Sequence, residues 1–150
     1  MMLQTQLSVF LVNKPGVLGQ VCDVLARAKV NIMALTMMDS SEHGVLRLVV
    51  EDVARAKKAL SVLNVPMTET DVLCLELDNH AGALADVCQT LGEKHINIGY
   101  AYCTAGARGG RTLGVFKVAD NKKALRVLKP AAKGKRRAAT ARAPRPGTRR

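Results

Sequence analysis

The sequence lacks the features that would directly indicate a metalloprotein or a membrane protein. It has no tryptophan, two tyrosines, two phenylalanines, and four cysteines without a C-x-x-C pair, so the ligand spacing of common zinc sites is absent. No uncharged apolar run reaches the roughly 18 residues that a membrane span needs, and the N-terminus has no signal-peptide pattern. We therefore expect a soluble, cytoplasmic protein without a metal or cofactor, whose cysteines are reduced and mostly packed.

Acidic residues are missing from the C-terminal end. The formal net charge is +11, yet residues 129–150 hold nine Lys and Arg and no Asp or Glu. The 14 basic and 12 acidic residues of 1–128 leave that part of the chain near +2. Such a charge run is usually solvated, and its Ala, Arg and Pro content predicts disorder over 129–150.

Catalytic patterns are also missing. No Ser-His-Asp, Cys-His or paired-carboxylate arrangement stands out along the chain. The stretch GARGGR from Gly106 joins two expected strands and opens no helix, so it is interpreted as a hairpin loop and not as a phosphate loop. The sequence therefore predicts a protein that is not an enzyme.

An internal repeat covers most of the chain. Residues 12–32 read VNKPGVLGQVCDVLARAKVNI, and residues 78–98 read DNHAGALADVCQTLGEKHINI. An offset of 66 residues aligns the two segments, Gly16 with Gly82 among them, and the tetrapeptide KKAL recurs at an offset of 65. Two copies are too few for a solenoid, which indicates tandem duplication of one module.

Each copy alternates between strand and helix periodicity. Leu7, Val9 and Leu11 fall on one face of a strand, and Val21 and Leu25 recur at helical spacing. The other elements expected in the first copy are strands over 31–38 and from Gly44, a helix over 54–63, and a short edge strand over 66–70. This β-α-β-β-α-β order predicts the α+β class, with two tandem ferredoxin-like modules whose helices cover one face of an antiparallel sheet.

The expected modules span residues 1–70 and 71–128, and the basic tail follows. No alternating segment comes after Leu128, so the second module is expected to lack its last strand. That would leave a sheet edge unpaired unless another chain or module covers it. The tail is either a genuine basic arm or the product of a reading-frame shift near Lys129, and the sequence leaves both open.

Apolar side chains are expected on the sheet face that the helices leave uncovered. Both alternating sets of the second strand are apolar, with Ile32 and Ala34 on one face and Met33, Leu35 and Met37 on the other. Phe10 adds to the uncovered side. Exposed apolar patches generally mark an interface, which predicts that the modules pack on each other, that the chain forms a homodimer, or both.

The turn before the first helix of each copy has the chemistry of a binding site. Gly16 and Gly82 let a ligand approach the backbone, and the first N–H groups of a helix suit a carboxylate or phosphate. Asn13 and Asn79 would either cap the helix or offer a carbonyl oxygen to an ammonium group. Such a turn suits a zwitterion, although capping and packing alone would also account for these residues.

The two quoted segments, within β-α-β-β-α-β, resemble the ACT domain, a regulatory module known for binding amino acids. The resemblance covers roughly residues 4–128 as two tandem copies with no attached enzyme. It implies a ligand site where two modules meet, between the strand-to-helix turn of one and the second strand of its neighbour. The ligand-binding residues that it implies are Asn13, Pro15, Gly16, Val17, Leu18, Asn31, Ile32, Asn79, His80, Gly82, Ala83, Leu84, Asn97 and Ile98.

The function implied is that of an amino-acid-binding regulatory protein, which acts through ligand-dependent association with a separate partner such as a metabolic enzyme. His80 replaces Lys14 and Ala81 replaces Pro15, so the two sites need not bind alike.

Two alternatives stay open, namely a scaffold or oligomerisation module without a ligand and a nucleic-acid binder acting through the tail. The RNA-recognition fold shares the topology but stacks bases on sheet aromatics. The four aromatics here, Phe10, Tyr100, Tyr102 and Phe116, do not form the pattern of that fold.

Overall fold

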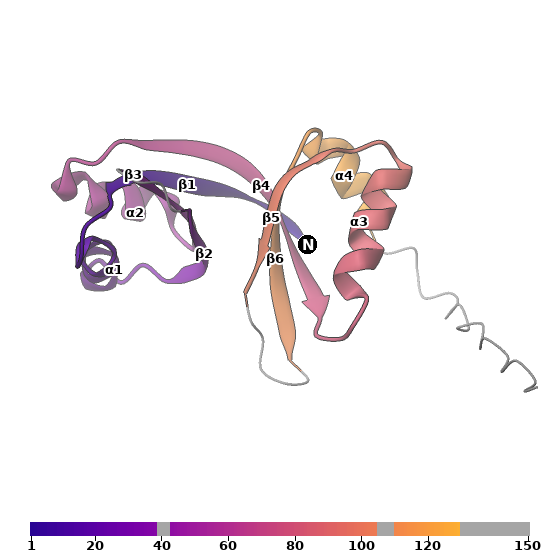
Figure 1. The fold of residues 1–150 in the computed structure, drawn as a ribbon, viewed down its shortest axis with the longest axis horizontal. Helices are drawn as coiled ribbons and strands as arrows, with labels where there is room; N and C mark the ends of the chain where they lie inside the picture. Colours follow the sequence, from indigo (N-terminus) through magenta and orange to yellow (C-terminus); the bar gives the residue numbers. More distant parts are fainter. Residues whose placement is uncertain (39–42, 105–109, 130–150) are drawn as a thin grey trace, which may run out of the picture.

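The computed structural model describes residues 1–38, 43–104 and 110–129 (Figure 1). The elements in chain order are β1 (Met2–Val12), α1 (Val17–Arg27), β2 (Ile32–Met38), β3 (His43–Val50), α2 (Val53–Leu60), the 3-10 helix η1 (Ser61–Leu63), β4 (Met67–Asp78), α3 (Ala83–Glu93), β5 (Ile98–Cys103), β6 (Arg111–Val118) and α4 (Asn121–Leu128). The polar turn at 39–42, the loop at 105–109 and the expected disorder over 130–150 lie outside the described residues.

Two repeats of the same element order build this structure. The first repeat is β1-α1-β2-β3-α2 and the second repeat is β4-α3-β5-β6-α4. Their strands form one antiparallel sheet in the order β2-β3-β1-β4-β6-β5. The expected α+β fold with tandem ferredoxin-like modules is therefore confirmed.

The two central strands are long because each of them serves both repeats. β1 pairs with β4 from Met2 opposite Cys74 to Val9 opposite Met67. The first part of β4 thereby completes the sheet of the first repeat, and its second part pairs with β6. The N-terminal part of β1 lies where a last strand of the second repeat would lie. The sheet edge that was expected to be unpaired unless another module covers it is covered in this way.

A single strand thus crosses the sequence-based module boundary, since β4 runs through residues 70 and 71 without interruption. The sequence pattern had suggested two separate short strands here. The division into residues 1–70, 71–128 and 129–150 stays a prediction.

All four helices lie on one face of the sheet, with α1 and α2 over one half and α3 and α4 over the other (Figure 1). Leu7, Val9 and Leu11 of β1 are fully buried beneath α1 and α2, as predicted. Leu3 belongs to the same alternating set of β1 as these residues, and Leu73 pairs with Leu3. Leu73 therefore points to the same face of the sheet, where it packs against the second pair of helices. Apolar side chains at alternate strand positions thus position both helix pairs.

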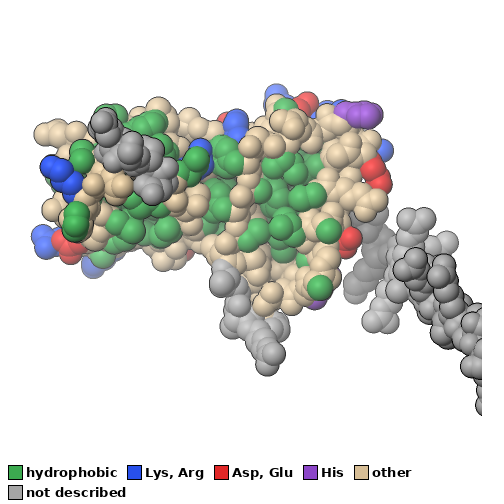
Figure 2. All heavy atoms as spheres, viewed as in Figure 1, with side chains coloured by type: hydrophobic (Ala, Val, Ile, Leu, Met, Phe, Trp, Pro, Cys, Tyr) green, Lys and Arg blue, Asp and Glu red, His purple; other side chains and the backbone are tan. Residues whose placement is uncertain are grey.

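The opposite, helix-free face joins the two repeats. Its buried apolar side chains are Ala34, Val49, Val72, Cys74 and Val115. They come from β2, β3, β4 and β6, so they form one cluster that spans both repeats. Figure 2 shows hydrophobic side chains gathered across the middle of the molecule, over both halves. The prediction that the two modules pack on each other is therefore confirmed, through a shared sheet.

The second strand presents its side chains differently from the prediction. A register shift between Ile32 and Ala34 places Ile32 opposite Val50 and Ala34 opposite Val49. Ile32 therefore packs on the helix side, whereas Ala34 is buried on the helix-free face. The expected shared face of these two residues was wrong because a β-bulge breaks the period of two.

Two local features differ from what the sequence pattern predicts, namely the position of His95 and the burial of the cysteines. The helix pattern of the second repeat favours a helix that reaches His95, but His95 lies beyond the end of α3, exposed and with a φ of 54°. The cysteines are not mostly packed, since Cys74 is buried, Cys22 is half-buried, and Cys88 and Cys103 are exposed. For Cys88 the apolar helix pattern misled, because α3 has a more exposed outer surface than α1.

Candidate ligand-binding site

Both strand-to-helix turns place a glycine at the N-cap. Gly16 has φ 88° before α1, and Gly82 has φ 98° before α3. Residues other than glycine rarely adopt this left-handed backbone conformation, so glycine is required at both turns. The equivalence of the two turns, predicted from the repeat, extends to their backbone geometry.

The asparagines were expected either to cap these helices or to face a ligand. The N-cap residues are instead Gly16 and Gly82, which have no side chain to make a cap hydrogen bond. Asn13 and Asn79 stand three positions before these glycines and are exposed, and each of them makes an interaction of its own. The asparagines therefore do not occupy the N-cap position, and their role towards a ligand stays a prediction.

The space beside each cap is open. Apart from the glycine itself and the residues adjacent to it in the chain, no described residue has an atom within 4 Å of the position that a Cβ on Gly16 or Gly82 would occupy. Helix N–H groups carry the positive end of the helix dipole at such a position. The two turns are thus accessible places for a carboxylate or another anion.

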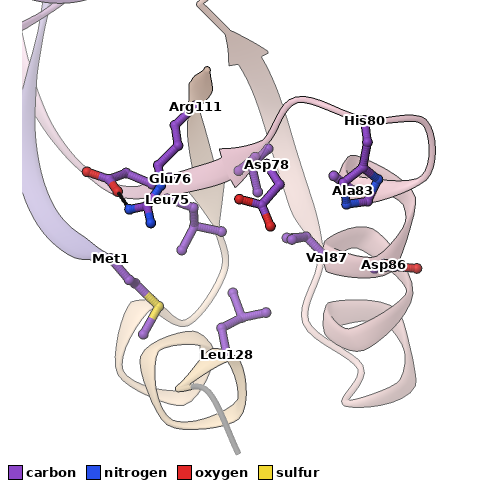
Figure 3. Close-up of a pocket in the computed structure, with 11 residues that line it drawn as sticks. Met1, Leu75, Glu76, Asp78, His80, Ala83, Asp86, Val87, Arg111 and Leu128 are labelled. Atoms are coloured by element: carbon purple, nitrogen blue, oxygen red, sulfur yellow. Dashed lines mark hydrogen bonds and ion pairs between the residues drawn. The ribbon is translucent and has the colours of Figure 1, made fainter. Parts of the chain in front are cut away.

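A cavity lies beside the second turn (Figure 3). It measures about 480 Å³. Its lining residues come from β4, β6, α3 and both ends of the described chain, namely Met1, Leu75, Glu76, Leu77, Asp78, His80, Ala83, Asp86, Val87, Arg111 and Leu128. The volume is in the range of small-molecule pockets.

Two of the predicted ligand-binding residues, His80 and Ala83, line this cavity. Near it in the chain are Asn79, Gly82 and Leu84 on the same turn and helix start. The first turn, with Asn13, Pro15, Gly16, Val17 and Leu18, belongs to the other repeat. Sequence reasoning missed the acidic side chains of the cavity, although Asp78 stands directly before the duplicated Asn.

The starts of the second strands lie away from both turns. Ile32 pairs with Val50, next to the pair of Val49 and Gln6, so the edge strand β2 begins level with the middle of β1 along the strand direction. Ile98 pairs with Val118, two residues beyond the partner of Leu73, so the edge strand β5 begins level with the middle of β4. The turns, by contrast, follow the far ends of β1 and β4. One chain therefore does not bring the turn of one repeat against the second-strand start of the other.

Asn31 and Asn97 make equivalent backbone contacts at these strand starts. The Asn31 carbonyl accepts from the Glu51 amide at 3.2 Å, and the Asn97 carbonyl accepts from the Ala119 amide at 3.0 Å. The Asn31 side chain also donates to Glu51 Oε1 at 2.9 Å. These contacts fix the chain before β2 and β5, which is a structural role.

Charge around the cavity is mostly negative. Glu76 Oε2 accepts a hydrogen bond from Arg111 Nη1 at 2.5 Å, and this contact, together with the nearby Asp78, raises the pKa of the guanidinium. The negative charge of Glu76 is therefore balanced by the positive charge of Arg111. Figure 3 shows the Asp78 carboxylate directed towards the space between Leu75 and Val87, whereas Asp86 lies at the rim.

A polar cluster on the helix-free face links the repeats and was not found from the sequence. The fully buried Gln6 of β1 donates from Nε2 to the Tyr100 hydroxyl at 2.7 Å and accepts at Oε1 from the Tyr102 hydroxyl at 3.0 Å. The Arg47 guanidinium lies 4.0 Å from the centre of the Tyr100 ring. Burial raises the pKa of the Tyr102 hydroxyl above its usual range. The two tyrosines thereby reach across β6 and β4 to the first repeat.

Two β-α-β-β-α repeats on one sheet, each with an open glycine turn before its first helix, define a tandem ferredoxin-like α+β protein. A family model described as an ACT domain pair matches residues 1–131. The chain therefore belongs to the ACT domain pair family.

Solved structures agree with this assignment. Protein BT0572 from Bacteroides thetaiotaomicron is 35% identical, with a TM-score of 0.78 over 85% of this chain and 88% of that chain. The ligand-free regulatory subunit of aspartate kinase from Thermus thermophilus shares the fold at 13% identity, with a TM-score of 0.64 over 84% and 92% of the two chains. The corresponding subunit from Thermus flavus gives 18% identity and a TM-score of 0.59 over the same shares. No curated protein matches the sequence.

Among the described residues, no group of three or more His, Cys, Asp and Glu side chains is arranged to hold a metal ion. Within the same residues, no helix is both long and apolar enough to span a membrane.

Proposed function

We propose that this chain is a regulatory protein that binds a small molecule, most simply an amino acid, at its strand-to-helix turns. The observation that supports the proposal is the pair of helix starts that follow a left-handed glycine, where a Cβ on the glycine would meet open space. The N–H groups of the first helical turn and the helix dipole favour a carboxylate there. Membership of the ACT domain pair family adds a regulatory role to that chemistry.

A second copy of the chain would complete the sites that the family resemblance implies. Within one chain, the turn of one repeat does not face the second-strand start of the other. We infer that Asn31, Ile32, Asn97 and Ile98 contribute only where two chains meet, in a homodimer. Leu35, Met37 and Met38 at the β2 edge are 44%, 40% and 49% exposed, and such apolar exposure supports an interface.

Regulation would follow from binding linkage. A ligand shifts an equilibrium only by the difference between its affinities for the two states. A ligand that bridges two chains binds the associated state better, so it would stabilise that state and change the surface offered to a separate partner, such as a metabolic enzyme. A location of the protein in the cytoplasm would fit this role.

Base stacking on the sheet is disfavoured as an alternative. Phe116 is fully buried on the helix side, and the hydroxyls of Tyr100 and Tyr102 are bonded to Gln6. RNA-recognition sheets instead present exposed aromatic faces.

A thermal-shift screen of the full chain against the twenty amino acids tests the proposal. A ligand at 100 times its dissociation constant stabilises the native state by about 2.7 kcal/mol. We expect one amino acid or a related group to raise the Tm. In Gly16→Val or Gly82→Val, the ligand-induced increase should be lost at the changed turn, measured against the variant's own ligand-free Tm.

Gly92→Ala is the matched control. Gly92 lies within α3, has open space around it, and does not have a positive φ. This variant should keep the full ligand-induced shift. A folded wild-type protein that shows no shift with any of the twenty amino acids would contradict the proposed function and favour a scaffold without a ligand.

A further inference from the structure

The cavity beside the second turn combines an apolar floor with one inward carboxylate. Leu75, Leu77, Val87 and Leu128 contribute apolar surface, and the Asp78 carboxylate is directed into the space between Leu75 and Val87 (Figure 3). The neighbouring cation, Arg111, is engaged by Glu76. A ligand that enters this cavity therefore meets hydrocarbon on one side and a negative charge that Arg111 does not directly bind.

The first repeat has no carboxylate at the matching places. Val12 ends β1 opposite His43 just as Asp78 ends β4 opposite Arg111. By the internal repeat, Phe10 stands for Glu76 and Gln20 stands for Asp86. All three acidic residues of the cavity are thus specific to the second repeat.

The end of the helix layer supplies apolar side chains at matching places in both repeats. In the first repeat, Leu63 and Met67 pack against the hydrophobic core. In the second repeat, Leu128 and Met1 stand at the corresponding places and border the cavity.

We propose that this cavity is a cation-selective subsite, which binds the protonated amine of a small ligand at Asp78 and the apolar part of that ligand over Leu75, Val87 and Leu128. The first repeat does not share the subsite, so each chain carries one such site. The inference rests on the proposed function, because His80 and Ala83 belong to both, and it deepens that function by naming the ligand class. Ligands that carry a carboxylate without an amine are excluded by the charge of Asp78.

Isothermal titration of the full chain with three probes tests the subsite. The probes share a similar apolar chain: norleucine has both an amine and a carboxylate, n-pentylamine has only the amine, and hexanoate has only the carboxylate. We expect norleucine and n-pentylamine to bind at one site per chain and to bind more weakly as salt is raised. Hexanoate should not bind in the cavity.

Asp78→Asn is the decisive variant, since it keeps the size of the side chain and removes the charge. Asp78 is exposed, so the fold should survive. Loss of a charge-assisted hydrogen bond should weaken both amine probes roughly tenfold or more. Asp71→Asn changes the same charge on the same strand outside the cavity, and it should leave both affinities unchanged.

The outcomes separate this inference from the proposed function. Unchanged binding of the amine probes in Asp78→Asn, no binding of n-pentylamine by the wild type, or binding of hexanoate as tight as that of n-pentylamine would overturn the subsite. If norleucine binds in that case, the proposed function still stands. If n-pentylamine binds through Asp78 while no amino acid shifts the Tm, the subsite stands and the proposed function fails.

Discussion

The two repeats have the same backbone fold but differ in the side chains that surround their strand-to-helix turns. Both have a helix that begins after a left-handed glycine. The first repeat surrounds its turn with Val12, Lys14 and Pro15, whereas the second has Asp78, His80 and Ala81 and a cavity beside them. The two turns therefore keep the same backbone geometry while the side chains around them differ.

Because the two repeats share one sheet, matched core substitutions in the two repeats test whether the repeats unfold together. Leu25 of α1 and Leu91 of α3 are equivalent, and both are fully buried. Replacing either by Ala should lower the free energy of unfolding by about 3 to 5 kcal/mol, because a cavity forms in the core. Because β1 and β4 join the repeats, each variant should unfold in one transition during urea denaturation followed by circular dichroism. Two separate transitions would show that the repeats are independent.

The polar link between the repeats should have the next largest effect. Gln6→Ala leaves the Tyr100 and Tyr102 hydroxyls without their buried partner, which should cost about 1 to 3 kcal/mol. Val72→Ala, at the equivalent position of the second repeat, removes only apolar contacts of the same face. The same urea experiment should show that Tyr102→Phe gives a smaller loss than Gln6→Ala. Equal stability of Gln6→Ala and the wild type would remove this link from the account.

The second helices of the repeats offer a matched pair of capping residues. Asp52 accepts from the Arg55 amide at 2.9 Å, and Asp120 accepts from the Lys123 amide at 2.8 Å. Replacing either by Ala should cost about 1 kcal/mol of unfolding free energy. Thermal denaturation of both variants measures it. A much larger loss for Asp120→Ala would show that α4 depends on its cap more than α2 does.

The rates at which cysteines react should differ between the two repeats, and this comparison needs no substitution that changes stability. Cys88 is exposed and its equivalent Cys22 is half-buried, so iodoacetamide should label Cys88 faster. Burial raises the pKa of the Cys74 thiol from 9.0 to about 11. Cys74 should therefore stay protonated at pH 9, where an ordinary thiol is half ionised, and react slowest. Mass spectrometry of the labelled peptides measures the order, and equal rates at Cys22 and Cys88 would contradict the difference in burial.

Local patterns predicted the parts of this fold that depend on local rules. The helix face of β1, the two glycine turns and the repeated element order follow from periodicity and backbone preference, and the structure has all of them. The bulge near Ala34 and the fusion of two short strands into β4 depend on pairing across the sheet, which one strand's own sequence does not encode. Gln6 was missed because a polar residue beside an apolar strand face is expected to point to water.

The candidate site was predictable only in part for the same reason. The duplicated turn identified His80 and Ala83, which line the cavity. Leu128 and Arg111 come from distant elements, so only the folded chain brings them to Asp78. Residues implied by resemblance, such as Asn31 and Asn97, lie at strand starts that one chain keeps away from the turns.

Amide chemical shifts of the labelled full chain, recorded during titration with pools of the twenty amino acids, would show directly whether a ligand binds at the turns. We expect at least one pool to shift amides of the second turn, around His80 to Leu84, and of the end of β4, around Leu75 to Asp78. Shifts at the first turn, around Asn13 to Leu18, should be smaller or follow a different amino acid. A folded protein in which no pool moves either turn would contradict the account.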